Sequence, residues 1–161
     1  NTLEQFLLAL RKATAIGRDI FSDSPIVVCL RTHSGVSRFE HRRTIESLRE
    51  AGIFFPDQRT IWSEAINSEE WLDETMPEYW VYLAFEATAS LLEPLLWCAL
   101  AKDFRAIQPN PGCDIYLFNF QKGVLAFPYD DRGMDVVGQI ARFCQPSMKR
   151  ISHFCSITTV K

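Results

Sequence analysis

The stretch that decides the fold runs from Cys113 to Asp135 and reads CDIYLFNFQKGVLAFPYDDRGMD. Two runs rich in β-branched and aromatic residues stand on either side of the polar turn Gln121-Lys122-Gly123, which is the pattern of a β-hairpin. A hairpin joins neighbouring strands in opposite directions, so this stretch predicts an antiparallel sheet. A second polar turn follows the hairpin directly, and it carries Asp130, Asp131, Arg132, Gly133 and Asp135.

Four apolar runs upstream of the hairpin predict further strands. Ile26–Leu30 is β-branched, Thr60–Ile66 alternates, and Tyr79–Ala87 is apolar on both faces, which indicates a strand inside the sheet. Leu95–Phe104 is interpreted as another antiparallel strand, because the short breaks around it leave no room for a crossover helix. The sequence therefore predicts a central, mainly antiparallel sheet of about five to six strands.

Three helices are expected to flank this sheet. Thr2 and Gln5 form a capping-box pattern at the start of an N-terminal helix that continues to Gly17. Ser37 and Glu40 open a second, largely solvent-facing helix that stops at Gly52. A C-terminal helix is expected to place five residues on one face, and these are Val136, Val137, Ile140, Ala141 and Cys144. The predicted fold is thus α+β, as one globular domain over residues 1–161.

The composition describes an ordinary globular domain. The chain has 161 residues, of which 47% are hydrophobic, enough apolar material for one core. No apolar run approaches the roughly 18 residues that a membrane-spanning helix needs, so no membrane partner is predicted. The chain begins at Asn1 without an initiator methionine, so we expect that a leader or a tag preceded it.

The five cysteines form no metal-binding pattern. None stands in a Cys-x-x-Cys pair or at zinc-finger spacing to a histidine. Cys29 and Cys98 lie in apolar runs, where a free cysteine behaves as a small hydrophobic residue, so we expect buried, reduced thiols and a cytoplasmic location. No Gly-rich phosphate loop or dinucleotide fingerprint occurs either, so neither a metal nor a cofactor nor a catalytic residue is predicted.

Charge is distributed very unevenly along the chain. From Thr60 to Ala101 there is no lysine, arginine or histidine, but there are eight acids; the remainder holds all 17 Lys and Arg residues with the other 12 acids. Such a segment attracts a basic partner, and tryptophan is a common anchor at protein interfaces. The residues predicted to bind are Glu69, Glu70, Trp71, Asp73, Glu74, Glu78 and Trp80. A solvated acidic loop is the alternative.

A nucleic-acid partner is not predicted. The arginines at positions 31, 38, 42, 43 and 49 alternate with acids, no aromatic stacking pattern is interleaved with them, and the pI is near 5.6. These arginines are better explained as members of a salt-bridged helix surface.

The turn at Asp130–Asp135 has two interpretations. Its carboxylates, with Asp114 or Glu86 from neighbouring strands, could hold magnesium for hydrolysis. Alternatively, Asp131 or Asp135 begins the following helix, Gly133 permits the turn, and Arg132 pairs with a carboxylate inside the domain. The structural use is preferred.

Three stretches carry a resemblance to a known family. Tyr82–Glu86, Trp97–Phe104 and above all the Tyr129–Asp135 motif resemble a bacterial domain family of unknown function, and residues 28–66 resemble it more weakly. The resemblance implies the fold and no activity. The preferred hypothesis is a non-catalytic protein-binding domain, in size and charge similar to immunity proteins that neutralise a toxin. The alternatives are the carboxylate-dependent metal hydrolase and a purely structural domain.

Overall fold

The computed structural model describes residues 2–22, 24–35, 41–66, 78–104, 106–130 and 133–138. In chain order the elements are α1 (Leu3–Phe21), β1 (Ile26–Ser34), α2 (Arg42–Glu50), β2 (Arg59–Ala65), β3 (Tyr79–Ala87), the 3₁₀ turn η1 (Ala89–Leu91), α3 (Leu92–Leu100), the 3₁₀ turn η2 (Ala101–Asp103), β4 (Asp114–Asn119), β5 (Val124–Asp130) and β6 (Gly133–Gly138).

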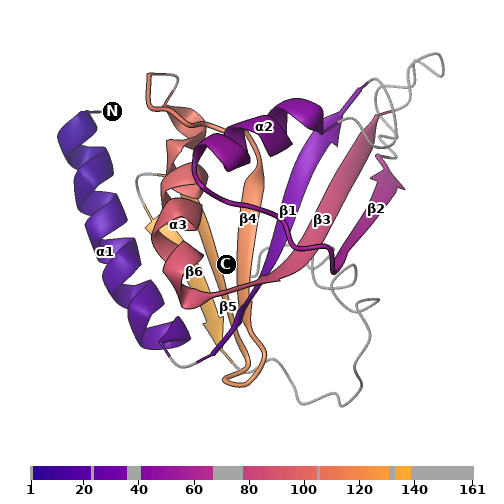
Figure 1. The fold of residues 1–161 in the computed structure, drawn as a ribbon. Helices are drawn as coiled ribbons and strands as arrows, with labels where there is room; N and C mark the ends of the chain where they lie inside the picture. The colour runs from indigo at the N-terminus through magenta and orange to yellow at the C-terminus, as the bar shows by residue number, and fades with distance from the viewer. Residues whose placement is uncertain are drawn as a thin grey trace.

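The six strands form one sheet in the order β2-β3-β1-β4-β5-β6, and every neighbouring pair is antiparallel. The fold is therefore the predicted α+β arrangement, and the β4–β5 hairpin and the interior position of β3 are confirmed. The strand β1 lies between β3 and β4, although it precedes both in the chain (Figure 1). The short connections in the sequence did not indicate this insertion.

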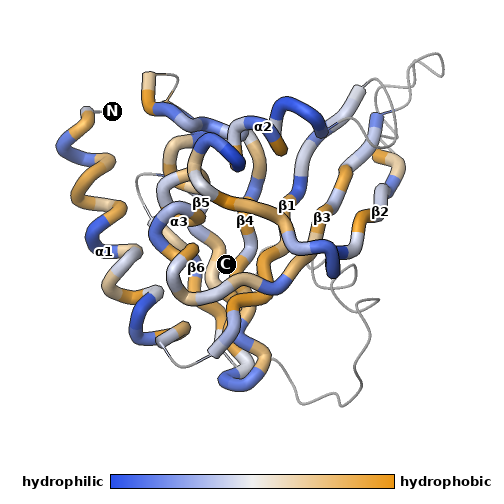
Figure 2. Tube along the Cα trace, viewed as in Figure 1, coloured by the Kyte–Doolittle hydropathy of each residue, from blue (hydrophilic) through white to orange (hydrophobic). Residues whose placement is uncertain are grey.

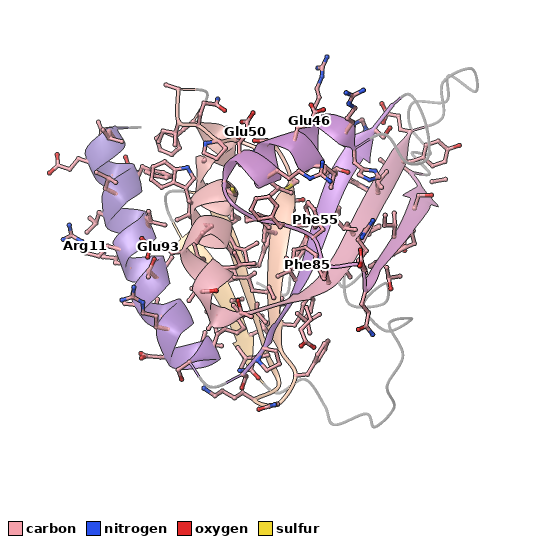
Figure 3. The ribbon with its side chains drawn as sticks, viewed as in Figure 1. Arg11, Glu46, Glu50, Phe55, Phe85 and Glu93 are labelled. Atoms are coloured by element: carbon pink, nitrogen blue, oxygen red, sulfur yellow. The ribbon has the colours of Figure 1, made fainter. Side chains whose placement is uncertain are left out.

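All three helices lie across the same face of the sheet (Figure 1). The main core forms between that face and the helices, with large buried side chains such as Phe6, Phe21, Phe85 and Leu96. Figure 2 shows α2 as hydrophilic along most of its length, and Leu48 is its one buried residue. Below it, Phe55 meets Phe85 edge to face with ring centroids 5.1 Å apart (Figure 3).

The prediction of a strand at Leu95–Phe104 is wrong, because this stretch forms α3 and η2. An apolar run of this length does not distinguish a buried strand from a buried helix. The helix α3 lies between the sheet and α1, so it is apolar nearly all round. Pro94 is accommodated because it stands in the first turn, where backbone N–H groups have no partner within the helix.

The C-terminal helix does not begin where it was predicted. Val136 and Val137 belong to β6, which pairs with β5 from Val124 to Asp130. Their β-branched side chains suit a pleated strand, and β5 supplies the hydrogen-bonding partner that decides between the two structures. Asp135 lies within β6 and therefore caps no helix. Residues 139–161, with the rest of the predicted helix, lie outside the described residues.

The N-terminal helix extends past Gly17 to Phe21. Thr2 caps it as predicted, since its hydroxyl accepts a hydrogen bond from the Gln5 amide at 3.2 Å. Gly17 lies inside the helix because α3 passes close by: a Cβ at this position would stand 3.1 Å from Leu92. The prediction that the helix ends at Gly17 is therefore wrong, because this glycine serves the close packing of α1 on α3 and does not end the helix. The second helix ends before Gly52 as expected, whereas its proposed cap at Ser37 and Glu40 lies outside the described residues.

Candidate binding face

The face of the sheet opposite the helices is unusually aromatic. Strand alternation places on it Val27, Cys29, Arg31, His33, Trp62, Glu64, Trp80, Tyr82, Ala84, Glu86, Tyr116, Phe118, Leu125 and Phe127, and we call this set the aromatic face. Trp62 stacks on Tyr82 with centroids 4.9 Å apart, and Tyr116 stacks on Phe127 at 4.5 Å. Cross-strand aromatic pairs of this kind give a rigid surface.

A charged cluster lies in the middle of this face. The Arg31 guanidinium donates from Nε and Nη2 to Asp114 Oδ2 at 2.9 and 2.7 Å, and it lies 4.5 Å from the centroid of the Trp80 ring and 5.6 Å from that of Tyr116. Lys102 Nζ donates to the other oxygen of Asp114 at 2.5 Å. One mostly buried carboxylate thus holds two cations, and the cluster joins β1, β4 and η2.

The electrostatics of Arg31 reflect two opposing effects. Burial by itself lowers the pKa of the guanidinium. The hydrogen bond to Asp114, together with electrostatic attraction to Tyr116, Asp114 and Tyr82, outweighs burial, so the pKa of Arg31 lies above its ordinary value. Arg31 therefore stays charged, and its flat faces are held against the two aromatic rings by cation–π attraction.

The second charged group lies at the end of the sheet where β2 ends and β3 begins. Glu64 stands opposite Trp80 in the register and accepts a hydrogen bond from the Tyr82 hydroxyl at 3.3 Å. Glu78 Oε2 lies 3.2 Å from His33 Nε2, and the His33 ring meets Trp80 edge to face. We call Trp62, Glu64, Glu78, Trp80 and Tyr82 the acidic corner. It joins the exposed carboxylate of Glu78 and the half-buried carboxylate of Glu64 to stacked aromatic rings.

The structure brings together two of the predicted binding residues, Glu78 and Trp80. The other five, Glu69, Glu70, Trp71, Asp73 and Glu74, lie outside the described residues. Sequence reasoning missed Trp62, Glu64 and Arg31 as neighbours of Trp80. The alternation of Thr60–Ile66 and Tyr79–Ala87 could have placed Trp62 and Trp80 on related faces, but only the pairing of β2 and β1 with β3 brings these residues side by side.

The predicted turn lies where β5 ends and β6 begins. Asp130 is buried at the end of β5 and stands opposite Gly133, whereas Asp135 is exposed on β6 opposite Phe127. A Cβ at Gly133 would stand 2.9 Å from the Tyr129 hydroxyl, so a glycine suits this close approach. Asp131 and Arg132 lie outside the described residues, and their roles in an ion pair or a metal site stay predictions.

Cys29, Cys98 and Cys113 are buried free thiols, as expected for the first two; Cys144 and Cys155 lie outside the described residues. Burial raises the pKa of Cys98 to about 12, and burial, with the nearby thiol of Cys98, raises that of Cys113. Within the described ranges, no three His, Cys, Asp or Glu side chains are grouped so that they could hold a metal ion.

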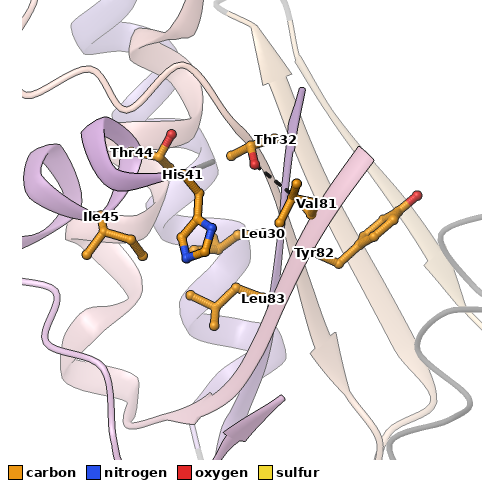
Figure 4. Close-up of a pocket in the computed structure, with 8 residues that line it drawn as sticks. All are labelled: Leu30, Thr32, His41, Thr44, Ile45, Val81, Tyr82 and Leu83. Atoms are coloured by element: carbon orange, nitrogen blue, oxygen red, sulfur yellow. Dashed lines mark hydrogen bonds between the residues drawn. The ribbon is translucent and has the colours of Figure 1, made fainter. Parts of the chain in front are cut away.

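Two cavities are found in the part of the chain that the structure describes, one of them small and the other open. One of about 10 Å³, room for a single water molecule, lies under the start of α2 (Figure 4). His41 points into it toward Leu30 and Leu83, and Thr32 donates a hydrogen bond to the Val81 carbonyl beside it. An open depression of about 330 Å³ lies near Ser24, Glu86 and Thr88. Neither gathers convergent catalytic groups, so the aromatic face is the better candidate site.

These features define the class of the protein: an α+β domain whose six-stranded sheet has helices on one face and a charged, aromatic surface on the other. A family model described as a domain of unknown function (DUF3885) matches residues 1–156, and the chain belongs to that family. No curated protein and no solved structure matched the chain. In the part of the chain that the structure describes, no helix is both long and apolar enough to cross a membrane.

Proposed function

We propose that this domain is a non-catalytic protein-binding module that holds a basic partner at the acidic corner. The observation that carries the proposal is the junction of β2 and β3, where Glu64 and Glu78 stand beside Trp62 and Trp80. Apart from Arg59, the first residue of β2, both strands belong to the segment from Thr60 to Ala101, which contains no basic residue. Carboxylates steer a basic partner toward this end of the sheet, and the rings offer rigid apolar contact area.

The finer assignment extends the same proposal. We propose a bacterial, cytoplasmic protein that neutralises a toxin or effector, because an inhibitor needs a preformed surface and no chemistry of its own. Glu69, Glu70, Trp71, Asp73 and Glu74 lie in the chain between β2 and β3, so the proposed interface extends into that segment. A basic toxin presents the charge that complements eight acids in this window.

The test is a charge reversal at the acidic corner. The variant Glu64→Lys/Glu78→Lys is compared with Glu46→Lys/Glu50→Lys, which makes the same change of charge on α2, on the other side of the sheet (Figure 3). The partner is the protein that co-purifies with the wild-type domain from its own cells or is encoded beside it. Surface plasmon resonance should show association slowed about tenfold or more by the first variant and within about twofold for the second.

Equal effects of the two variants would show that the corner has no specific role. The absence of any co-purifying or genetically linked partner would favour the structural domain instead.

A further inference from the structure

The aromatic face is more deeply buried than its described neighbours explain. Cys29, Tyr82, Ala84 and Phe118 are all at most 2% exposed. Among the described elements, the three helices all lie across the opposite face, and no strand crosses this one (Figure 1). Phe120 stacks on Phe118 at 5.7 Å and shields one part of its ring. The low exposure of these four side chains requires a further cover, because an apolar side chain on a sheet face is buried only where another segment packs over it.

A row of apolar side chains leads across the face from the end of β6. Val137 stands opposite Leu125, Leu125 opposite Phe118, and Phe118 opposite Val27. Glu86 on β3 ends the row, opposite Val27. Gly138, the last residue of β6, lies directly beside the start of this row. Residues 139–161 follow it in the chain, and we call them the C-terminal segment.

The C-terminal segment has the composition that suits this surface. It contains no Asp or Glu. Its cations are Arg142, Lys149, Arg150 and Lys161, and its large apolar residues are Ile140, Phe143, Met148, Ile151, Phe154, Ile157 and Val160. The family model extends to residue 156, so most of this segment belongs to the same family domain as the sheet.

The charges on the two sides are complementary. Glu64, Glu86 and Asp135 lie on or beside the aromatic face, which in the described residues has Arg31 as its central cation, already bound to Asp114. These acids attract a segment that has four cations and no acid. The apolar residues of the segment can pack on the apolar row from Val137 to Val27.

The segment is long enough to cover the face. Neighbouring strands are about 4.8 Å apart, so β3 lies about 19 Å from β6 across four spacings. An extended chain spans roughly 3.3 Å per residue, and six residues therefore reach about 20 Å. Cys144, six residues after Gly138, can thus reach the neighbourhood of Glu86.

We propose that the C-terminal segment packs across the aromatic face as its intramolecular cover, with apolar side chains over Cys29, Ala84 and Phe118 and cations toward the acids at the rim. Three residues of the acidic corner, Glu64, Glu78 and Trp80, lie at the other end of β3 from Glu86, and none of them is buried, so they stay available to a partner while the row is covered. The proposal is independent of the proposed function, because it concerns contacts within one chain.

Disulfide trapping in the full-length protein tests this arrangement, since the segment carries its own thiols at Cys144 and Cys155. The variant Glu86→Cys places a thiol at the end of the apolar row, and Glu50→Cys places one on exposed α2 as the matched control (Figure 3). Each is oxidised with oxidised glutathione, which accepts the two electrons released when two thiols join, and the peptides are mapped by mass spectrometry.

The expected result is an intramolecular disulfide between position 86 and Cys144 or Cys155, formed at least about tenfold faster than any disulfide at position 50. Adding Arg142→Glu, Lys149→Glu and Arg150→Glu should reduce its rate, whereas Arg11→Glu, Lys12→Glu and Arg49→Glu should not. Equal rates at positions 86 and 50, or no disulfide at either, would overturn the proposal. Disulfide-linked dimers would overturn it too, in favour of the segment of a second copy.

Discussion

Asp114 holds the charged cluster of the aromatic face together. Its two carboxylate oxygens hold Arg31 and Lys102, and it is 9% exposed. A carboxylate in this position is stable only because both cations neutralise it, and the cations in turn are fixed against Trp80 and the end of α3. The Asp114 side chain therefore links Arg31, which lies over the Trp80 ring, to Lys102 at the end of the helical layer.

We predict that Asp114→Asn lowers the free energy of unfolding by about 2–4 kcal/mol. This is somewhat less than the roughly 3–5 kcal/mol for a fully buried pair, because Lys102 is partly exposed and can return to water. Asp103→Asn, at an exposed carboxylate on η2, should change it by less than about 0.5 kcal/mol. Urea unfolding measures both. Equal changes in the free energy of unfolding in the two variants would show that the charged cluster makes no specific contribution to stability.

The buried thiols predict a dependence of stability on alkaline pH. The folded protein raises the pKa of Cys98 from 9.0 to about 12 through burial, so the neutral thiol stabilises the fold below pH 9 and this contribution disappears as the pH rises toward 12. Urea unfolding at a series of pH values should show wild type losing stability more steeply over this range than Cys98→Ala. Parallel curves would contradict the prediction.

At the scale of elements, the helices α1 and α3 pack closely against each other. Gly17 allows it, because any larger side chain meets Leu92, and Phe6 packs edge to face on Trp97 of α3 at 4.9 Å. The position of α3 under α1 also explains why its sequence is apolar all round, which made it resemble a strand.

We predict that Gly17→Val lowers the free energy of unfolding by about 1–3 kcal/mol, because the added methyl groups force the two helices apart. Ala15→Val, two residues earlier on the exposed side of α1, should cost only the weaker helix propensity of valine, about 0.5 kcal/mol. Thermal unfolding followed by circular dichroism compares the two. An equal loss of unfolding free energy in both variants would mean that Leu92 does not lie as close to position 17 as the distance of 3.1 Å from a Cβ there implies.

At the scale of the whole molecule, the net charge of −3 is the sum of a strongly acidic segment and a basic remainder of the chain. Eight acids fall between Thr60 and Ala101, the segment that supplies β3, α3 and all of β2 except Arg59, and all 17 Lys and Arg residues lie outside it. Such a field reaches beyond the surface and orients a charged partner before contact.

We predict that association with a basic partner slows steeply as salt rises from about 50 to about 500 mM, since the screening length falls from roughly 14 Å to roughly 4 Å. Stopped-flow association rates measure this effect, and dissociation rates should change far less. An association rate that is insensitive to salt would argue against electrostatic steering.

The sequence by itself determined much of this protein, because local patterns carry enough information for local structure. The Thr2 cap, the Ile26–Leu30 run, the alternation after Thr60 and the hairpin at Asp114–Phe127 each form the predicted element. The uneven charge is likewise a property of the sequence alone.

Only the tertiary structure decided the rest. An apolar run such as Leu95–Leu100 becomes a helix or a strand according to the surface it packs on, and Val136 joins a strand because β5 offers it hydrogen bonds. The insertion of β1 between β3 and β4 joins residues far apart in the chain, and that insertion is what places Arg31 between Trp80 and Tyr116.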